Sequence, residues 1–158
     1  MADKYRWFFL TVSLSVFVDR LSKYLVVQFL SDIGSFSIFR YFSFTLVKNR
    51  GLCFGILNNL NLRNFIVIAS FIIATGIFFC LKRYVKEKQI AIALGLIDGG
   101  IISNLIDRIS IGAVIDFINF HIWPVFNLAD TCIVSGVFIV LVNHFKRGKY
   151  ASGVSKNR

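Results

Sequence analysis

The sequence predicts an all-α membrane protein with four transmembrane helices, folded as a single domain over residues 1–158. Two observations indicate this class. Apolar residues make up 56% of the chain and proline occurs once, with a mean hydropathy of +0.72, values outside the usual range for a soluble domain. In addition, 11 of the 18 Lys and Arg residues fall within residues 1–6, 82–88 and 146–158. Each of these segments adjoins an apolar span, as the positive-inside rule expects.

Composition also excludes several classes of function. The net charge of +10 follows membrane topology, and no nucleic-acid recognition motif accompanies it, so no nucleic-acid partner is predicted. Cys53, Cys80 and Cys132 are odd in number and widely spaced, which supports neither a disulfide framework nor a zinc site. His121 and His144 lack the HExxH spacing of metalloproteases. We therefore predict no metal and no cofactor.

The first predicted helix covers about residues 7–30, preceded by Lys4 and Arg6. A basic start and an apolar centre could indicate a cleaved signal peptide. No small-residue cleavage site follows, however, and Asp19, Arg20 and Lys23 interrupt the apolar run. An uncleaved transmembrane helix is the better interpretation.

Those charges are costly within a bilayer unless they are paired. Asp19 and Lys23 are four residues apart and can pair on one helix face. At 1.5 Å per residue they lie roughly 18 and 24 Å from the inner end of a ~30 Å hydrocarbon core. They are either a tolerated helix-end ion pair or the support of a site at the outer face.

Residues 31–62 are predicted to be extracytoplasmic. Phe42, Phe44 and Leu46 alternate with Ser43 and Thr45, which predicts a short strand or two. The following step, Asn49-Arg50-Gly51, indicates a turn.

The second helix is expected at about 65–81, without charge, and the third at about 89–106. Gly95, Gly99, Gly100 and Ser103 make one side of the third helix small, which permits close helix contact. Asn104 and Arg108 follow at the outer end of this helix. Asp98 falls near the membrane midplane, where a protonated or internally hydrogen-bonded acid is expected.

Residues 107–126 are predicted to form an extracytoplasmic loop that contains Asp116. The fourth helix, at about 127–145, then returns to the cytoplasm with Asp130 in its first turn. The basic tail, 146–158, is expected to be disordered. Both termini are therefore predicted to be cytoplasmic.

Eight polar residues map to the outer interface: Asp19, Lys23, Asn49, Asn104, Arg108, Asp116, Asn127 and Asp130. Helices unrelated in sequence would not be expected to carry costly residues at one depth. Two nearby carboxyls, Asp116 and Asp130, can share a proton and perform acid–base chemistry on a peptide bond. The alternative from spacing alone is a helix cap and a loop residue.

Four motifs narrow these alternatives: VDRLSK, VKNRGLCFG, NLIDRISIGAVIDF and FNLADT. Together, in this order, they resemble lipoprotein signal peptidase (signal peptidase II), and the similarity covers nearly the whole chain. The resemblance implies a four-helix aspartic endopeptidase with a small extracytoplasmic β-cradle. It also implies catalytic roles for Asp116 and Asp130, and a structural role for Asp107. The supporting positions it implies are Asp19, Lys23, Asn49, Gly51, Asn104, Arg108 and Asn127.

Such enzymes remove the signal peptide from diacylglyceryl-modified prolipoproteins, before the lipidated cysteine, at the outer face of the bacterial cytoplasmic (inner) membrane. The resemblance therefore implies prolipoproteins and membrane lipid as partners, and we expect a monomer. Two residues depart from the family pattern: Cys53 replaces the usual alanine and Ser103 the usual glycine. From a different class, a small transport or assembly protein remains an alternative, favoured only by Asp98.

Overall fold

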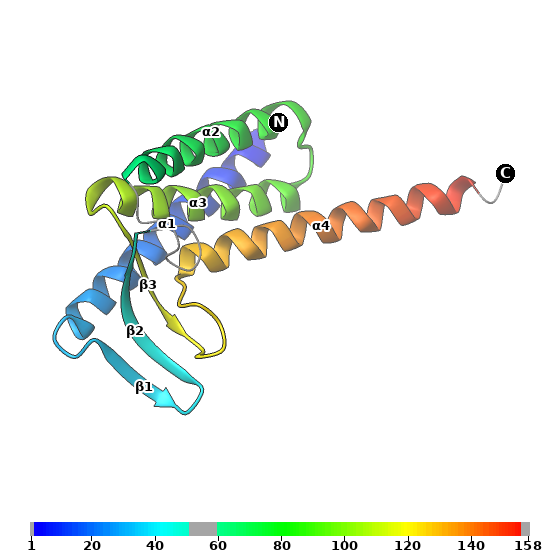
Figure 1. Ribbon diagram of the computed structural model, residues 1–158. Coiled ribbons are helices and arrows are strands. Elements are labelled where there is room, and N and C mark those ends of the chain that lie inside the picture. The colour runs from blue at the N-terminus through cyan, green and yellow to red at the C-terminus, as the bar shows by residue number, and fades with distance from the viewer. Residues whose placement is uncertain (1, 51–59, 156–158) are drawn as a thin grey trace.

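The computed structural model describes residues 2–50 and 60–155 and consists of four helices and a small sheet (Figure 1). The elements in order are α1 (Ala2–Leu30), β1 (Ser35–Phe39), β2 (Phe42–Asn49), α2 (Leu60–Tyr84), α3 (Lys88–Ser110), β3 (Val114–Asn119) and α4 (Leu128–Ser155). The helices lie where the apolar spans predict them, and most are longer at one or both ends. The chain is thus mostly helical, with the strands gathered at one end.

Helix α3 lies between α1 and α4 and positions both. A Cβ on Gly95 would lie 2.8 Å from the backbone oxygen of Phe8, and one on Gly99 would lie 2.7 Å from the Cβ of Ser15. Because the contacts advance along both helices together, α1 and α3 run parallel. The small face predicted for α3 therefore brings the α1 backbone into close contact.

On its other side α3 packs against α4, which runs antiparallel to it. A Cβ on Gly136 would meet the backbone oxygen of Ala93 at 2.5 Å, while Gly100 faces the backbone of Ala129. The N-terminus of α4 is therefore held against the C-terminal half of α3.

Three helices in the described ranges are long and apolar enough to cross a membrane: 64–83, 88–110 and 128–146. Helix α1 is long enough as well, but Asp19, Arg20 and Lys23 interrupt its apolar sequence. Three apolar helices support a membrane protein, and the fourth span remains a prediction.

The strands form one antiparallel sheet in the order β1-β2-β3. Strand β2 lies where apolar and polar residues alternate, which confirms that prediction. Strand β3, in contrast, lies within 107–126, where we expected only a loop. The extended conformation of β3 is stabilised by pairing with β2, where Val47 lies opposite Asp116. Pairing between strands that are distant in the sequence is not encoded in local periodicity. Gly112, with φ of 72°, makes the turn that leads from α3 into β3.

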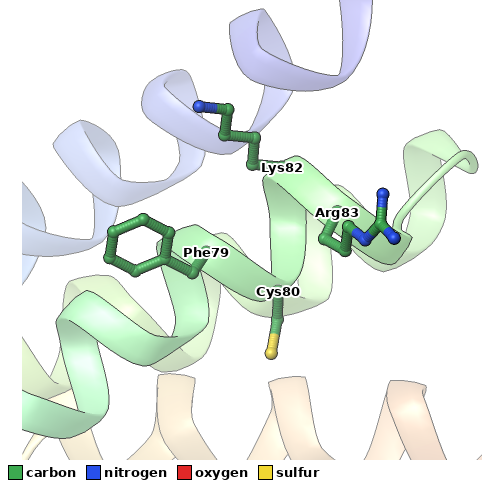
Figure 2. Close-up of a pocket in the computed structure, with 4 residues that line it drawn as sticks. All are labelled: Phe79, Cys80, Lys82 and Arg83. Carbon is green, nitrogen blue, oxygen red and sulfur yellow. The ribbon is translucent and has the colours of Figure 1, made fainter.

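The basic ends of α1, α2 and α3 meet at the opposite end of the bundle. The ammonium group of Lys4 donates to the backbone oxygens of Leu81 at 2.8 Å and Val85 at 2.7 Å. Beside them is a cavity of about 580 Å³ lined by Phe79, Cys80, Lys82 and Arg83. Figure 2 shows Lys82 extending toward α1 and Cys80 toward α4. None of the described residues that line this cavity is acidic.

Helix α4 differs from the expected boundary because it continues to Ser155, through residues predicted to be a disordered tail. No proline interrupts this stretch, and its isolated glycines cost only about 1 kcal/mol each in a helix. In Figure 1 the C-terminal half of α4 extends away from the other helices.

Candidate active site

Asp116 and Asp130 are linked through one residue, Asn127. The Asn127 Nδ2 donates to Asp116 Oδ1 at 2.6 Å, and its backbone N–H donates to Asp130 Oδ2 at 3.2 Å. In return the Asp130 N–H donates to Asn127 Oδ1 at 2.9 Å. Asn127 immediately precedes α4, so this reciprocal pair is a capping box at the start of that helix. Asp130 therefore does cap a helix, and the same contact holds it close to Asp116.

Two further asparagines bind the remaining carboxylate oxygens. Asn49, at the end of β2, donates from Nδ2 to Asp116 Oδ2 at 3.0 Å. Asn104, on α3, donates from Nδ2 to Asp130 Oδ1 at 2.9 Å, and its Oδ1 accepts from Asn127 Nδ2 at 3.1 Å. Each carboxyl group is therefore oriented from two sides by uncharged donors.

A buried positive charge, the ammonium group of Lys23, lies on the other side of Asn104 from Asp130. It is 2.7 Å from Asp19 Oδ2, 2.9 Å from Asp107 Oδ2 and 2.9 Å from Asn104 Oδ1. The predicted pairing of Asp19 with Lys23 is thus present. Lys23 and Asp19 are 1% and 0% exposed, and a fully buried charge requires such partners. The pair lies inside the polar cluster and connects α1 to the candidate site.

Asp19 also fixes the beginning of α4. Its Oδ1 accepts from the backbone N–H of Ala129 at 2.8 Å, and its Oδ2 accepts from the Ser103 hydroxyl at 2.6 Å. A carboxylate at a helix N-terminus is favourable because it meets unpaired N–H groups and the positive end of the helix dipole. Ser103, where the resemblance led us to expect a glycine, therefore supplies a hydrogen bond to Asp19 that a glycine side chain cannot make.

Asp107 joins the cluster to the strand that carries Asp116. It forms ion pairs with Lys23 and with Arg20, and its Oδ2 accepts from the backbone N–H of Ile115 at 3.2 Å. Arg20 was absent from the predicted supporting residues. Its position three residues before Lys23, on a neighbouring part of the same helix face, was the signal that could have indicated it.

Asp116 is buried, and burial changes the pKa of its carboxyl group. Burial raises the pKa of Asp116 to about 6, because the charged carboxylate loses water. The neighbouring charge of Asp130 raises the pKa further, while hydrogen bonds from Asn49 and Asn127 and the charge of Lys23 lower it. Asp116 can therefore hold or release a proton near neutral pH.

The remaining predicted residues lie at the edge of this cluster or outside it. Arg108 donates from Nη1 to the Asn104 backbone oxygen at 3.4 Å and interacts electrostatically with both carboxyls. Gly51 and Cys53 lie outside the described residues. Asp98 is buried elsewhere on α3, and its Oδ1 has no hydrogen-bond partner in the part of the chain that the structure describes. Of the two states expected for this acid, protonated or internally hydrogen-bonded, the structure shows no hydrogen bond to this oxygen within the described residues.

The fold and this cluster define a membrane protein with two carboxyl groups, the buried Asp116 and the half-buried Asp130, linked through Asn127 at one end of its helices. Residues 11–146 match the sequence model of the family described as Signal peptidase (SPase) II. The chain belongs to the signal peptidase II family, as its motifs indicated.

Individual relatives agree with this assignment. The lipoprotein signal peptidase of Caldanaerobacter subterraneus subsp. tengcongensis is 37% identical over 131 residues, covering 82% of this chain and 89% of the relative. That of Aquifex aeolicus is 35% identical over 149 residues, covering 90% and 88%. A bacterial membrane enzyme solved by the in meso method at 2.3 Å resolution superposes with a TM-score of 0.79 at 28% identity, covering 88% of this chain and 87% of that one. Family membership supports a peptidase role.

Proposed function

We propose that this chain is a membrane aspartic endopeptidase that removes the signal peptide from diacylglyceryl-modified prolipoproteins, cutting just before the lipidated cysteine. Membership of the signal peptidase II family, whose relatives are named lipoprotein signal peptidases, supports the substrate class. The observation that carries the aspartic mechanism is the bridge from Asn127 to both Asp116 and Asp130. Two carboxyls joined in this way can act on one peptide bond.

In this mechanism one carboxylate accepts a proton from water while the other, protonated, donates a hydrogen bond to the peptide carbonyl. The water oxygen attacks the carbonyl carbon, and the proton then passes to the leaving amine. The raised pKa of Asp116, about 6, supports a proton held by the pair near neutral pH. Because the two groups interact, they titrate as a pair rather than separately. Asn49, Asn104, Asn127 and Arg108 orient the carboxyls, and Gly51 keeps the supporting role that the resemblance implies.

We further propose that α1 is a fourth membrane span, so that both termini are cytoplasmic and the carboxyl pair lies at the outer face of the inner membrane. Helix α1 runs parallel to the apolar helix α3, from the Phe8–Gly95 contact to the Lys23–Asp107 ion pair. It therefore covers the same depth as α3. We expect this enzyme to act as a monomer in contact with membrane lipid.

The test uses purified protein, a lipidated precursor peptide and its unlipidated twin. The wild type should cleave the lipidated form alone, while Asp116→Asn and Asp130→Asn should each lose cleavage by at least a factor of roughly 100, the scale of acid–base catalysis. Asp98→Asn is the matched control, since it changes another buried acid on α3. Normal processing by either dyad variant would rule out the mechanism. Transport sensitive to Asp98→Asn but indifferent to Asp116→Asn would favour the alternative class.

A further inference from the structure

A second cavity, of about 500 Å³, lies between the last turns of α1 and the β1–β2 hairpin. Its lining is entirely apolar and includes Leu25, Val26, Phe29 and Leu30 from α1, with Phe36 and Phe44 from the sheet. In Figure 1 this end of α1 lies beside the sheet. Phe29 and Phe36 are 74% and 55% exposed. Aromatic surface of this kind, next to a polar cluster, indicates a binding site for hydrocarbon.

The cavity and Asp116 lie on the same face of the sheet. Phe36 is paired with Phe44, and Phe44 with Ile118. Directly paired residues point to the same side, and residues two apart on a strand share a side as well. Asp116 is two residues from Ile118 on β3, so its side chain points to the side on which Phe36 and Phe44 line the cavity.

The distance from Asp116 to the cavity is similar to the distance from the scissile bond to the acyl chains of the proposed substrate. Asp116 and Ile118 are separated by about 7 Å along β3, and Phe44 lies about 5 Å across from Ile118, so Phe44 is about 8 to 9 Å from Asp116 by strand geometry. From the scissile carbonyl carbon to the nearest acyl carbonyl of a diacylglyceryl-cysteine, the path is eight bonds. At about 1.2 Å of advance per bond this spans about 10 Å. An acyl chain therefore begins near the cavity when the peptide bond meets the carboxyls.

We propose that this cavity binds one acyl chain of the diacylglyceryl group on the substrate cysteine, a proposal that rests on the proposed function. Among the described residues its lining side chains are all apolar, so its affinity is for hydrocarbon, through burial of apolar surface. Leu25 and Phe36 are then specificity residues that recognise the lipid. They take no part in the chemistry.

The test measures kcat and KM on lipidated peptides with long and short acyl chains in the same detergent. Leu25→Trp fills the cavity. Leu21→Trp is the matched control, because Leu21 lies one helical turn earlier on α1 and is 44% exposed against 43% for Leu25, yet does not line the cavity. Leu25→Trp should lower the long-to-short ratio of kcat/KM about tenfold, the effect of losing roughly two methylene contacts. The change should appear in KM, while Leu21→Trp leaves the ratio unchanged.

Phe36→Trp fills the same cavity from the opposite wall and is expected to give the same result, so the test survives if Leu25→Trp fails to fold. If both variants fold and keep the wild-type ratio, the cavity does not bind the acyl chain and the proposed function stands. If the wild type cleaves no lipidated peptide, the proposed function fails and this inference fails with it.

Discussion

At the scale of single residues, the candidate site depends on Asn127. An amide side chain can donate and accept at the same time, and Asn127 uses both abilities to contact Asp116, Asp130 and Asn104. Replacing it with an aspartate would place a third carboxyl in the site. The asparagine thus gives the pair a close, uncharged link, which a shared proton requires.

The buried carboxyl of Asp116 predicts a pH dependence of stability. Its pKa of about 6 lies above the 3.8 of an ordinary Asp, so the folded state binds a proton that the unfolded state has released between these values. The contribution of Asp116 to the free energy of unfolding, roughly 3 kcal/mol, is fully present below about pH 4. It is lost as the pH rises through about 6.

The measurement is the melting temperature of the wild type and of Asp116→Asn in detergent from pH 4 to 7. The amide loses hydrogen bonds at every pH, so the informative quantity is how the difference changes. The melting temperature of Asp116→Asn should rise relative to that of the wild type as the pH rises. A difference that stays constant across this range would contradict the burial effect.

At the scale of elements, the small face of α3 determines where the site residues lie. Gly95 and Gly99 admit α1, while Gly100 admits the first turn of α4. Asn104 follows on the same helix, one turn after Gly100, between Lys23 and Asp130. Helix spacing therefore sets the distance between the charged residues of α1 and the carboxyl of α4.

Gly100→Ala and Gly76→Ala should have opposite effects. A Cβ at Gly100 would collide with the backbone of Ala129, whereas one at Gly76 meets nothing within 4 Å among the described residues. Overpacking costs about 1 to 3 kcal/mol, and Gly100→Ala should also displace Asp130, so both melting temperature and kcat should fall. Gly76→Ala should preserve kcat and raise stability by about 0.5 to 1 kcal/mol, because alanine favours a helix. Equal melting temperatures and activities for the two variants would show that α3 and α4 do not need this contact.

At the scale of the whole molecule, the basic ends of α1 and α2 lie at the end of the bundle opposite the carboxyl cluster. Lys4 meets the end of α2 beside Lys82, while Asp107, Asp116 and Asp130 gather near the sheet. The positive-inside rule predicts that the end with Lys4 and Lys82 is the cytoplasmic one.

This arrangement predicts the topology. A reporter that fluoresces only in the cytoplasm should be bright when fused before residue 1 or after residue 158. Placed in the turn between β1 and β2, it should be dark. A dark N-terminal fusion with a bright C-terminal one would mean that α1 does not cross the membrane, and would leave three spans.

The sequence by itself determined the membrane class, the positions of the apolar helices, strand β2 and, through its motifs, the residues that gather at the site. These are recorded locally, as hydropathy, alternation and the spacing of charges along a helix. Tertiary structure alone decided that 114–119 is a strand, that Arg20 and Ser103 join the polar cluster, and that Asn127 bridges the two carboxyls. The strand and the two added residues depend on partners distant in the chain, and Asn127 reaches Asp116 eleven positions away although its contact with Asp130 is a local capping box. A hydrogen bond between distant residues leaves no period in the sequence that would predict it.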